Sequence, residues 1–90
     1  MAVEVRIPTI FRQYTGGVKL VNAEGTTLDE VILNLDASNP GISERLVDKG
    51  ELRRFINVYL NDEDVRFLDG LDTVVADQDS IAIIAAVAGG

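Results

Sequence analysis

The chain has 90 residues with 15 acidic and 8 basic side chains, which give a formal net charge of -7. That length allows one small domain, over residues 1–90, and no separate catalytic domain. The chain has no cysteine and no histidine, which excludes disulfides, thiolate metal sites, side-chain persulfides and an imidazole base. Its negative charge makes nucleic acids and anionic membranes poor partners. We therefore do not expect an enzyme.

The charge is uneven along the chain. Residues 1–54 hold seven basic and eight acidic side chains, whereas residues 55–90 hold one basic side chain, Arg66, and seven acidic ones. One interpretation is an acidic surface that complements a basic partner. The other is that the acidic residues occupy turns, where aspartate is favoured for backbone reasons, and keep the loops soluble.

Neither a secretory signal nor a membrane anchor is expected. Glu4 and Arg6 interrupt the first apolar stretch before a hydrophobic signal region can form. The longest apolar run, residues 81–88, has eight residues, whereas a membrane-spanning helix needs about 20. The sequence therefore predicts a cytoplasmic protein.

The first elements form a predicted hairpin. Residues 3–7 alternate apolar and charged side chains, which indicates a strand with one buried face, and Pro8 ends it. Residues 16–17 are both glycine and predict a turn into a second strand over residues 18–21. The long connection, residues 9–17, has room for a short irregular turn.

A helix is predicted to start at Thr27. Thr27 and Glu30 fit a capping box, in which the threonine oxygen accepts from the amide of Glu30 and the glutamate reaches back to the cap amide. Residues 39–41, Asn-Pro-Gly, end the helix after about three turns, because proline lacks the amide hydrogen. The buried face is predicted to hold Leu28, Val31, Ile32 and Leu35.

The second half of the chain contains mainly strands. Residues 42–54 predict a short helical turn and a loop, and residues 55–60 are rich in strand-forming side chains. Further strands are predicted over residues 65–67 and 81–87. In residues 55–60, alternation places Ile56, Val58 and Leu60 toward the helix and Phe55, Asn57 and Tyr59 on the outer face.

This order of elements predicts an α+β fold, with a mixed β-sheet and one main helix packed on one face. The arrangement is that of the ubiquitin-like β-grasp fold. Because the first and last strands are both rich in valine and isoleucine, we expect them to lie side by side as a central parallel pair.

The terminal pair Gly89-Gly90 has odds of about one in two hundred by composition alone. Without a Cβ, such a tail can be threaded into a narrow slot, and residues 88–90 are expected to be flexible. Ala88, a small residue, belongs to the same threaded tail. The reactive group is then the carboxylate of Gly90, which an activating enzyme could adenylate and a sulfur nucleophile could attack. The alternative is an ordinary frayed terminus.

Several sequence stretches and the Gly-Gly end resemble the ubiquitin-like sulfur carriers of the ThiS and MoaD types. The resemblance covers nearly the whole chain and is greatest to the carriers of cysteine synthesis. The stretches are Ile-Pro-Thr at residues 7–9, Gly-Ile-Ser-Glu-Arg-Leu at 41–46, Arg-Phe-Ile-Asn-Val-Tyr at 54–59, Asn-Asp-Glu-Asp-Val-Arg-Phe at 61–67 and Ala-Val-Ala-Gly-Gly at 86–90.

The resemblance implies a carrier with no activity of its own and no bound cofactor or metal. An E1-like enzyme of the MoeB or ThiF type would use ATP to adenylate Gly90, and sulfuration would give a thiocarboxylate. A synthase would then take the sulfur: a PLP-dependent cysteine synthase acting on O-phosphoserine, or a thiosugar synthase. In the cysteine route, a zinc metallopeptidase of the JAMM type would release the product.

Three alternatives remain open at this point. The chain could be a protein modifier conjugated to lysines, the small subunit of a molybdopterin synthase, or a binding module whose function survives removal of both terminal glycines. Only two lysines, Lys19 and Lys49, offer sites for chains of modifiers, and the tail lacks the leucine and arginine of ubiquitin. Both features weaken a protein-tagging role.

An outer apolar surface near the tail is the second candidate site. We expect Phe55, Tyr59 and Ile84 to form a docking surface; the alternative is a strand face without a partner. Arg53 and Arg54 either grip the activating enzyme or pair with nearby acids. The acidic run at residues 62–64 lacks the spacing of a calcium loop, so no metal site is predicted.

Overall fold

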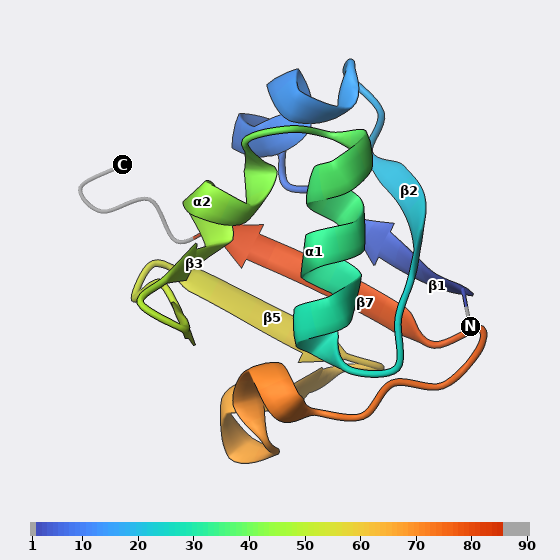
Figure 1. The fold of residues 1–90 in the computed structure, drawn as a ribbon, viewed down its shortest axis with the longest axis vertical. Coiled ribbons are helices and arrows are strands. Elements are labelled where there is room, and N and C mark those ends of the chain that lie inside the picture. Colours follow the sequence, from blue (N-terminus) through green and yellow to red (C-terminus); the bar gives the residue numbers. More distant parts are fainter. Residues whose placement is uncertain (1, 86–90) are drawn as a thin grey trace.

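Figure 1 shows the fold in a computed structural model. The structure describes residues 2–85. Its frame is a five-stranded sheet in the order β2-β1-β7-β5-β6, with helix α1 across one face. β1 and β7 are parallel, and the other neighbouring strands are antiparallel. The mixed sheet and the α+β β-grasp fold are thus confirmed. The elements are β1 (Ala2–Arg6), β2 (Leu20–Glu24), α1 (Leu28–Ser38), β5 (Ile56–Leu60), β6 (Glu63–Asp64) and β7 (Ser80–Ala85).

The core lies between the sheet and α1. Val5 is in register with Ile81 across the parallel pair, and Val58 is in register with Ile83 on the other side of β7. All four side chains are at most 4% exposed, so the predicted inward faces of these strands are confirmed. The four predicted core positions of α1 are buried as well. The central strand β7 therefore joins β1 to β5, and its side chains on the helix side, Ile81 and Ile83, are buried in the core.

The start of α1 differs from the predicted capping box in one respect. The Thr27 side chain accepts a hydrogen bond from the amide of Glu30 at 3.3 Å, as predicted. The Glu30 carboxylate, however, accepts from the amide of Thr26 at 2.8 Å and from its hydroxyl at 2.7 Å. Thr26 offers two donors to one carboxylate oxygen, whereas the cap amide offers one.

The second strand was predicted too early in the chain. A 3-10 helix, η1 (Thr9–Thr15), fills the long connection after β1, and β2 runs over Leu20–Glu24 instead of residues 18–21. The buried Thr15 explains the shift. Its hydroxyl donates to the carbonyl of Val18 at 2.6 Å, and the amide of Val18 donates to the carbonyl of Thr15 at 3.2 Å. These bonds hold Val18 in the turn.

The predicted strand over residues 65–67 is also wrong. These residues form the 3-10 helix η2 (Val65–Phe67), and only the preceding Glu63–Asp64 pair with β5. The side chain of Asp64 caps this helix by accepting from the amide of Arg66 at 2.9 Å. Local capping by an aspartate therefore outweighs the strand preference of valine and phenylalanine.

The remaining elements are short. The expected helical turn is helix α2 (Ile42–Leu46), which is followed by a small two-stranded sheet that the sequence did not predict. No described helix is both long and apolar enough for a membrane span. The further elements are β3 (Val47–Asp48), β4 (Glu51–Leu52) and the 3-10 helix η3 (Gly70–Asp72).

Candidate functional site

The candidate site is the surface around the C-terminal end of β7. β7 is the middle strand of the sheet, and its last residue, Ala85, is in register with Ile56 at the start of β5. Gly90, Gly89 and Ala88, the predicted sites of sulfur attachment and threading, lie outside the described residues 2–85. The structure therefore defines the surface around the strand that precedes them in the sequence.

The three predicted docking residues lie on the outer side of the sheet or at its edge. Ile84 is 47% exposed, whereas its neighbour Ile83 is buried on the helix side. Tyr59 is partly buried and lies opposite Ala82 in the register, so Tyr59 and Ile84 are diagonal neighbours on the outer face. Phe55, 56% exposed, precedes β5. The predicted placement on the outer sheet face is confirmed for Tyr59 and Ile84, whereas Phe55 lies in the turn before the strand; docking stays a prediction.

A hollow of about 350 Å³ lies between η1 and the end of β7. Ile10 and Ile84, both about half exposed, supply apolar surface to it. Two basic side chains line the same hollow. The lining residues are Arg6, Ile7, Pro8, Thr9, Ile10, Arg12, Ile83, Ile84 and Ala85.

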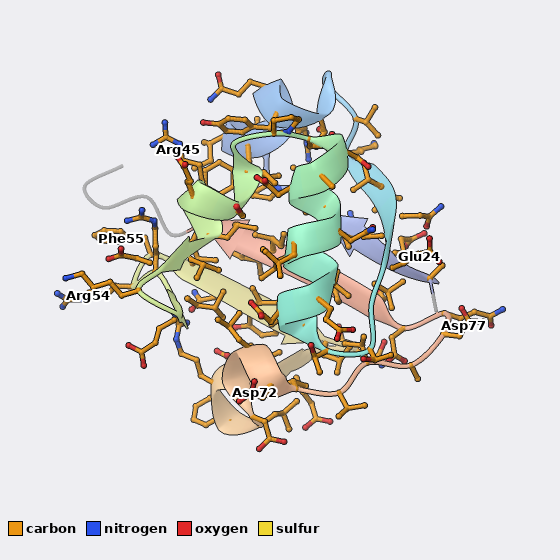
Figure 2. The ribbon with its side chains drawn as sticks, viewed as in Figure 1. Glu24, Arg45, Arg54, Phe55, Asp72 and Asp77 are labelled. Carbon is orange, nitrogen blue, oxygen red and sulfur yellow. The ribbon has the colours of Figure 1, made fainter. Side chains whose placement is uncertain are left out.

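A second hollow, of about 270 Å³, lies beside the start of β5. Figure 2 shows Phe55, Arg54 and Arg45 projecting from this flank of the molecule, toward which β7 points. The end of β7 is thus bordered by exposed apolar and basic side chains. The lining residues are Asp48, Lys49, Glu51, Leu52, Arg53, Arg54 and Phe55.

Arginines around this end make hydrogen bonds to neutral oxygens. Arg53 donates through Nε to the carbonyl of Glu44 at 2.8 Å. Arg45 donates through Nε to the phenol oxygen of Tyr14 at 2.7 Å. These bonds fix the side chains without neutralising them, because neither acceptor carries a negative charge.

Comparison with known proteins identifies the family of the chain. The model of the ThiS family matches residues 5–90. The chain belongs to the ThiS family. Sulfur carrier protein CysO from Mycobacterium tuberculosis is 58% identical over 93 residues, which cover 100% of both chains. Small archaeal modifier protein 3 from Haloferax volcanii is 32% identical over 92 residues, which again cover 100% of both chains.

One solved structure shows the fold of this ThiS-family chain in an assembly. In the crystal structure of the Amycolatopsis orientalis BexX/CysO complex, the similar chain superposes with a TM-score of 0.94 and 53% identity. The match covers 98% of this chain and 99% of that chain. The two chains are therefore similar in amino-acid sequence as well as in fold.

Arg66 organises the start of β5 in this ThiS-family chain, and sequence reasoning missed its role. Its guanidinium donates through Nη2 to the carbonyls of Arg53 at 2.9 Å and Ile56 at 2.6 Å. Nη1 donates to the side chain of Asn57. The only hint in the sequence was that Arg66 is the single base in residues 55–90. Arg66 therefore fixes the segment from which Phe55 projects.

Several carboxylates serve structure in the ThiS-family chain. The amide of Ser43 donates to Asp36 at 3.0 Å and lowers the pKa of Asp36, and the amide of Gly41 adds to this effect. The amide of Ala76 likewise lowers the pKa of Asp79. Partial desolvation opposes both shifts without reversing them. Both carboxylates are stabilised as anions. This property is suited to holding loops through hydrogen bonds from backbone amides, and it is not suited to donating a proton in catalysis.

Within residues 2–85, no group of three or more acidic side chains is arranged to hold a metal ion. Among the described residues, the candidate site consists of the exposed surface around the end of β7, with its apolar and arginine side chains.

Proposed function

We propose that the chain is a sulfur carrier whose covalent site is the C-terminal carboxylate of Gly90. The observation that carries this proposal is the full-length, 58% identical match to the sulfur carrier protein CysO. The family match over residues 5–90 supports it, because the matched range includes the Gly-Gly end.

The proposed chemistry takes place on enzymes that bind the carrier. A carboxylate oxygen of Gly90 attacks the α-phosphorus of ATP on an E1-like enzyme of the MoeB or ThiF type, and pyrophosphate leaves. A sulfur nucleophile at the oxidation level of sulfide then attacks the acyl carbon, and AMP leaves with the oxygen. The product is the thiocarboxylate of Gly90. The carrier supplies the terminus and the docking surface, and ATP belongs to the enzyme.

The composition supports the terminus as the covalent site. The chain has no cysteine, so none of its side chains can carry sulfur as a thiol or persulfide. Glycine at the two last positions leaves the acyl carbon free of side-chain obstruction. The reaction then needs no catalytic side chain from the carrier.

The proposed recipient is a PLP-dependent cysteine synthase acting on O-phosphoserine. The thiocarboxylate sulfur becomes bonded to the serine Cβ and phosphate leaves, which gives a thioester between Gly90 and cysteine. The cysteine amine then attacks the acyl carbon and the thiol leaves, so that cysteine is joined to Gly90 by an amide. A JAMM-type zinc metallopeptidase hydrolyses this amide and restores the Gly90 carboxylate. A thiosugar synthase is a second recipient of the same chemistry, because a thiocarboxylate can deliver sulfur to either acceptor. The BexX/CysO complex supports stable association of such a carrier with a second protein.

Deletion of Gly90 tests the covalent site. The deletion displaces the carboxylate by about 3.5 Å, so adenylation by the activating enzyme should fall by at least roughly 100-fold. The assay is exchange of labelled pyrophosphate into ATP. Gly90→Ala is the comparison variant, because it keeps the carboxylate in place and adds a Cβ beside the acyl carbon; its loss measures side-chain obstruction alone and should be smaller than that of the deletion. Normal exchange by the deletion variant would exclude the terminus as the site.

A second candidate function is conjugation to other proteins, which the 32% identity to small archaeal modifier protein 3 favours. Conjugation predicts an isopeptide bond between Gly90 and a lysine of a target protein. Mass spectrometry of digests from native cells separates the two roles. A terminal thiocarboxylate supports the carrier role, and Gly90-linked lysines support the modifier role.

A further inference from the structure

The topology collects basic side chains at the end of the sheet where β7 ends. Because β1 is parallel to β7, the C-terminal residue of β1, Arg6, lies at this end, and so does the following 3-10 helix η1, which contains Arg12. Because β5 is antiparallel to β7, the segment before β5, with Arg53 and Arg54, lies there as well. Arg45 joins them through its hydrogen bond to the side chain of Tyr14 in η1.

The acidic side chains at the opposite end complete this separation of charge. Glu24 ends β2 and is in register with Ala2 at the start of β1. Asp77 accepts a hydrogen bond from the amide of Ala2 at 3.1 Å, just before β7 begins. Figure 2 shows Arg45 and Arg54 on one flank and Glu24 and Asp77 on the other. The molecule therefore has a basic end although its net charge is -7.

The basic end keeps its positive character against its local surroundings. Three acidic residues, Glu44, Asp48 and Glu51, lie among the same segments and are outnumbered by the basic ones. The two flanks lie at opposite ends of the intermediate axis of the molecule, which extends 27 Å, whereas the Debye length at physiological salt is about 8 Å. Salt therefore screens the far acidic end, and a partner that approaches the end of β7 meets mainly the nearby cations.

We propose that this basic end, defined as Arg6, Arg12, Arg45, Arg53 and Arg54, docks on an acidic protein surface around the tail-binding channel of the activating enzyme. The proposal rests on the proposed carrier function. Charge complementarity carries it: four exposed arginines and the half-buried Arg12 lie around the end of β7, and the hydrogen bonds described above for Arg45 and Arg53 go to neutral oxygens. The exposed Ile84 lies within the same surface and supplies apolar contact.

The distribution of charge also orients the carrier. An acidic channel mouth attracts the basic end and repels the end with Glu24 and Asp77, so encounters occur with the tail foremost. Exposed charge pairs add little lasting affinity and act mainly on the association rate. A carrier that must leave one enzyme for the next benefits from both properties.

Two matched double variants test the proposal. Arg45→Gln with Arg54→Gln removes two positive charges from the basic end. Asn22→Asp with Gln78→Glu adds two negative charges near the opposite end, where both side chains line a hollow with Asp77. Both variants lower the net charge by the same amount, so only the position differs. Thermal unfolding checks that each variant is folded.

The measurement is the KM of the activating enzyme for each full-length carrier, by pyrophosphate exchange at about 0.1 M and about 1 M salt. We expect the KM of the arginine variant to rise roughly tenfold at the lower salt, with kcat unchanged, and the difference to vanish at the higher salt. The opposite-end variant should change by less than about twofold.

Each contrary result has a distinct meaning. Equal KM values for the two variants, or a change in kcat alone, would overturn the docking proposal while adenylation continues. A further outcome would favour nucleic acid as the partner of the basic end. In that case the unaltered carrier and the opposite-end variant would bind a single-stranded oligonucleotide, the arginine variant would not, and the KM values of the two variants for the activating enzyme would be equal. If the unaltered carrier is not adenylated, the proposed function fails and the docking proposal fails with it.

Discussion

Truncation of two adjacent isoleucines tests the placement of β7 most sharply. Ile83 is 4% exposed on the helix side of the sheet, whereas Ile84 is 47% exposed on the outer side. Ile83→Ala removes buried methyl groups and leaves a cavity, which costs about 2 to 5 kcal/mol. Ile84→Ala removes a side chain that is already half in water, so it should cost only about 1 kcal/mol.

Thermal unfolding followed by circular dichroism measures this difference. For a domain of this size each kcal/mol lowers Tm by about 4 to 8 °C, so Ile83→Ala should lower Tm by about 8 to 40 °C and Ile84→Ala by about 4 to 8 °C. Equal losses would refute the alternation of β7. Ile84→Asp extends the test to function, because a charge in a buried interface is costly: affinity for the activating enzyme should fall while the fold survives.

Three further outcomes follow from the contacts described above. Arg66→Met removes the donors to two backbone carbonyls before and within β5, so stability should fall by about 1 to 2 kcal/mol and amide exchange in that segment should rise; unchanged exchange would contradict the role. Folding lowers the pKa of Asp36 and Asp79 from the ordinary value of 3.8, so their contribution is present above that pH and is lost as the pH falls through the folded value. Replacing either with Asn should flatten the dependence of Tm on pH below about 5. Gly25→Ala should destabilise by about 1 to 3 kcal/mol, because the new Cβ would lie 2.7 Å from the amide nitrogen of Val31; an unchanged Tm would show that the backbone yields.

Elements with strong local signals were predictable from the sequence. The start of α1 depends on the hydrogen bond that Thr27 accepts, and its end on Pro40, which lacks an amide hydrogen; both effects are local in the sequence. The valine and isoleucine content of the first and last strands predicted that they form a parallel pair, and the observed pairing of β1 with β7 confirms it. Pattern and packing agree at these positions.

Elements that depend on single side-chain hydrogen bonds were not predictable. The start of β2 is delayed by the hydroxyl of Thr15, and the predicted strand at residues 65–67 becomes a 3-10 helix because Asp64 caps it. Neither bond has a periodic signal in the sequence, and both override strand propensity.

The candidate site was predictable in its residues but not in its charge. The sequence placed Phe55, Tyr59 and Ile84 on an outer surface and located most of the acidic excess in the second half of the chain. Strand direction then carries Asp77 to the far end of the sheet and brings Arg54 beside the end of β7. A linear count of charge cannot show this separation, because it arises from the pairing of strands.

The intact mass of the protein isolated from its native cell, under non-denaturing and rapid conditions, tests the central claim most directly. Replacement of one carboxylate oxygen by sulfur adds about 16 Da to the chain, and fragmentation should place this increment on Gly90, the only position that our proposal assigns to covalent sulfur. An unmodified terminus in cells that are actively transferring sulfur, or an increment that maps within residues 2–85, would contradict the account.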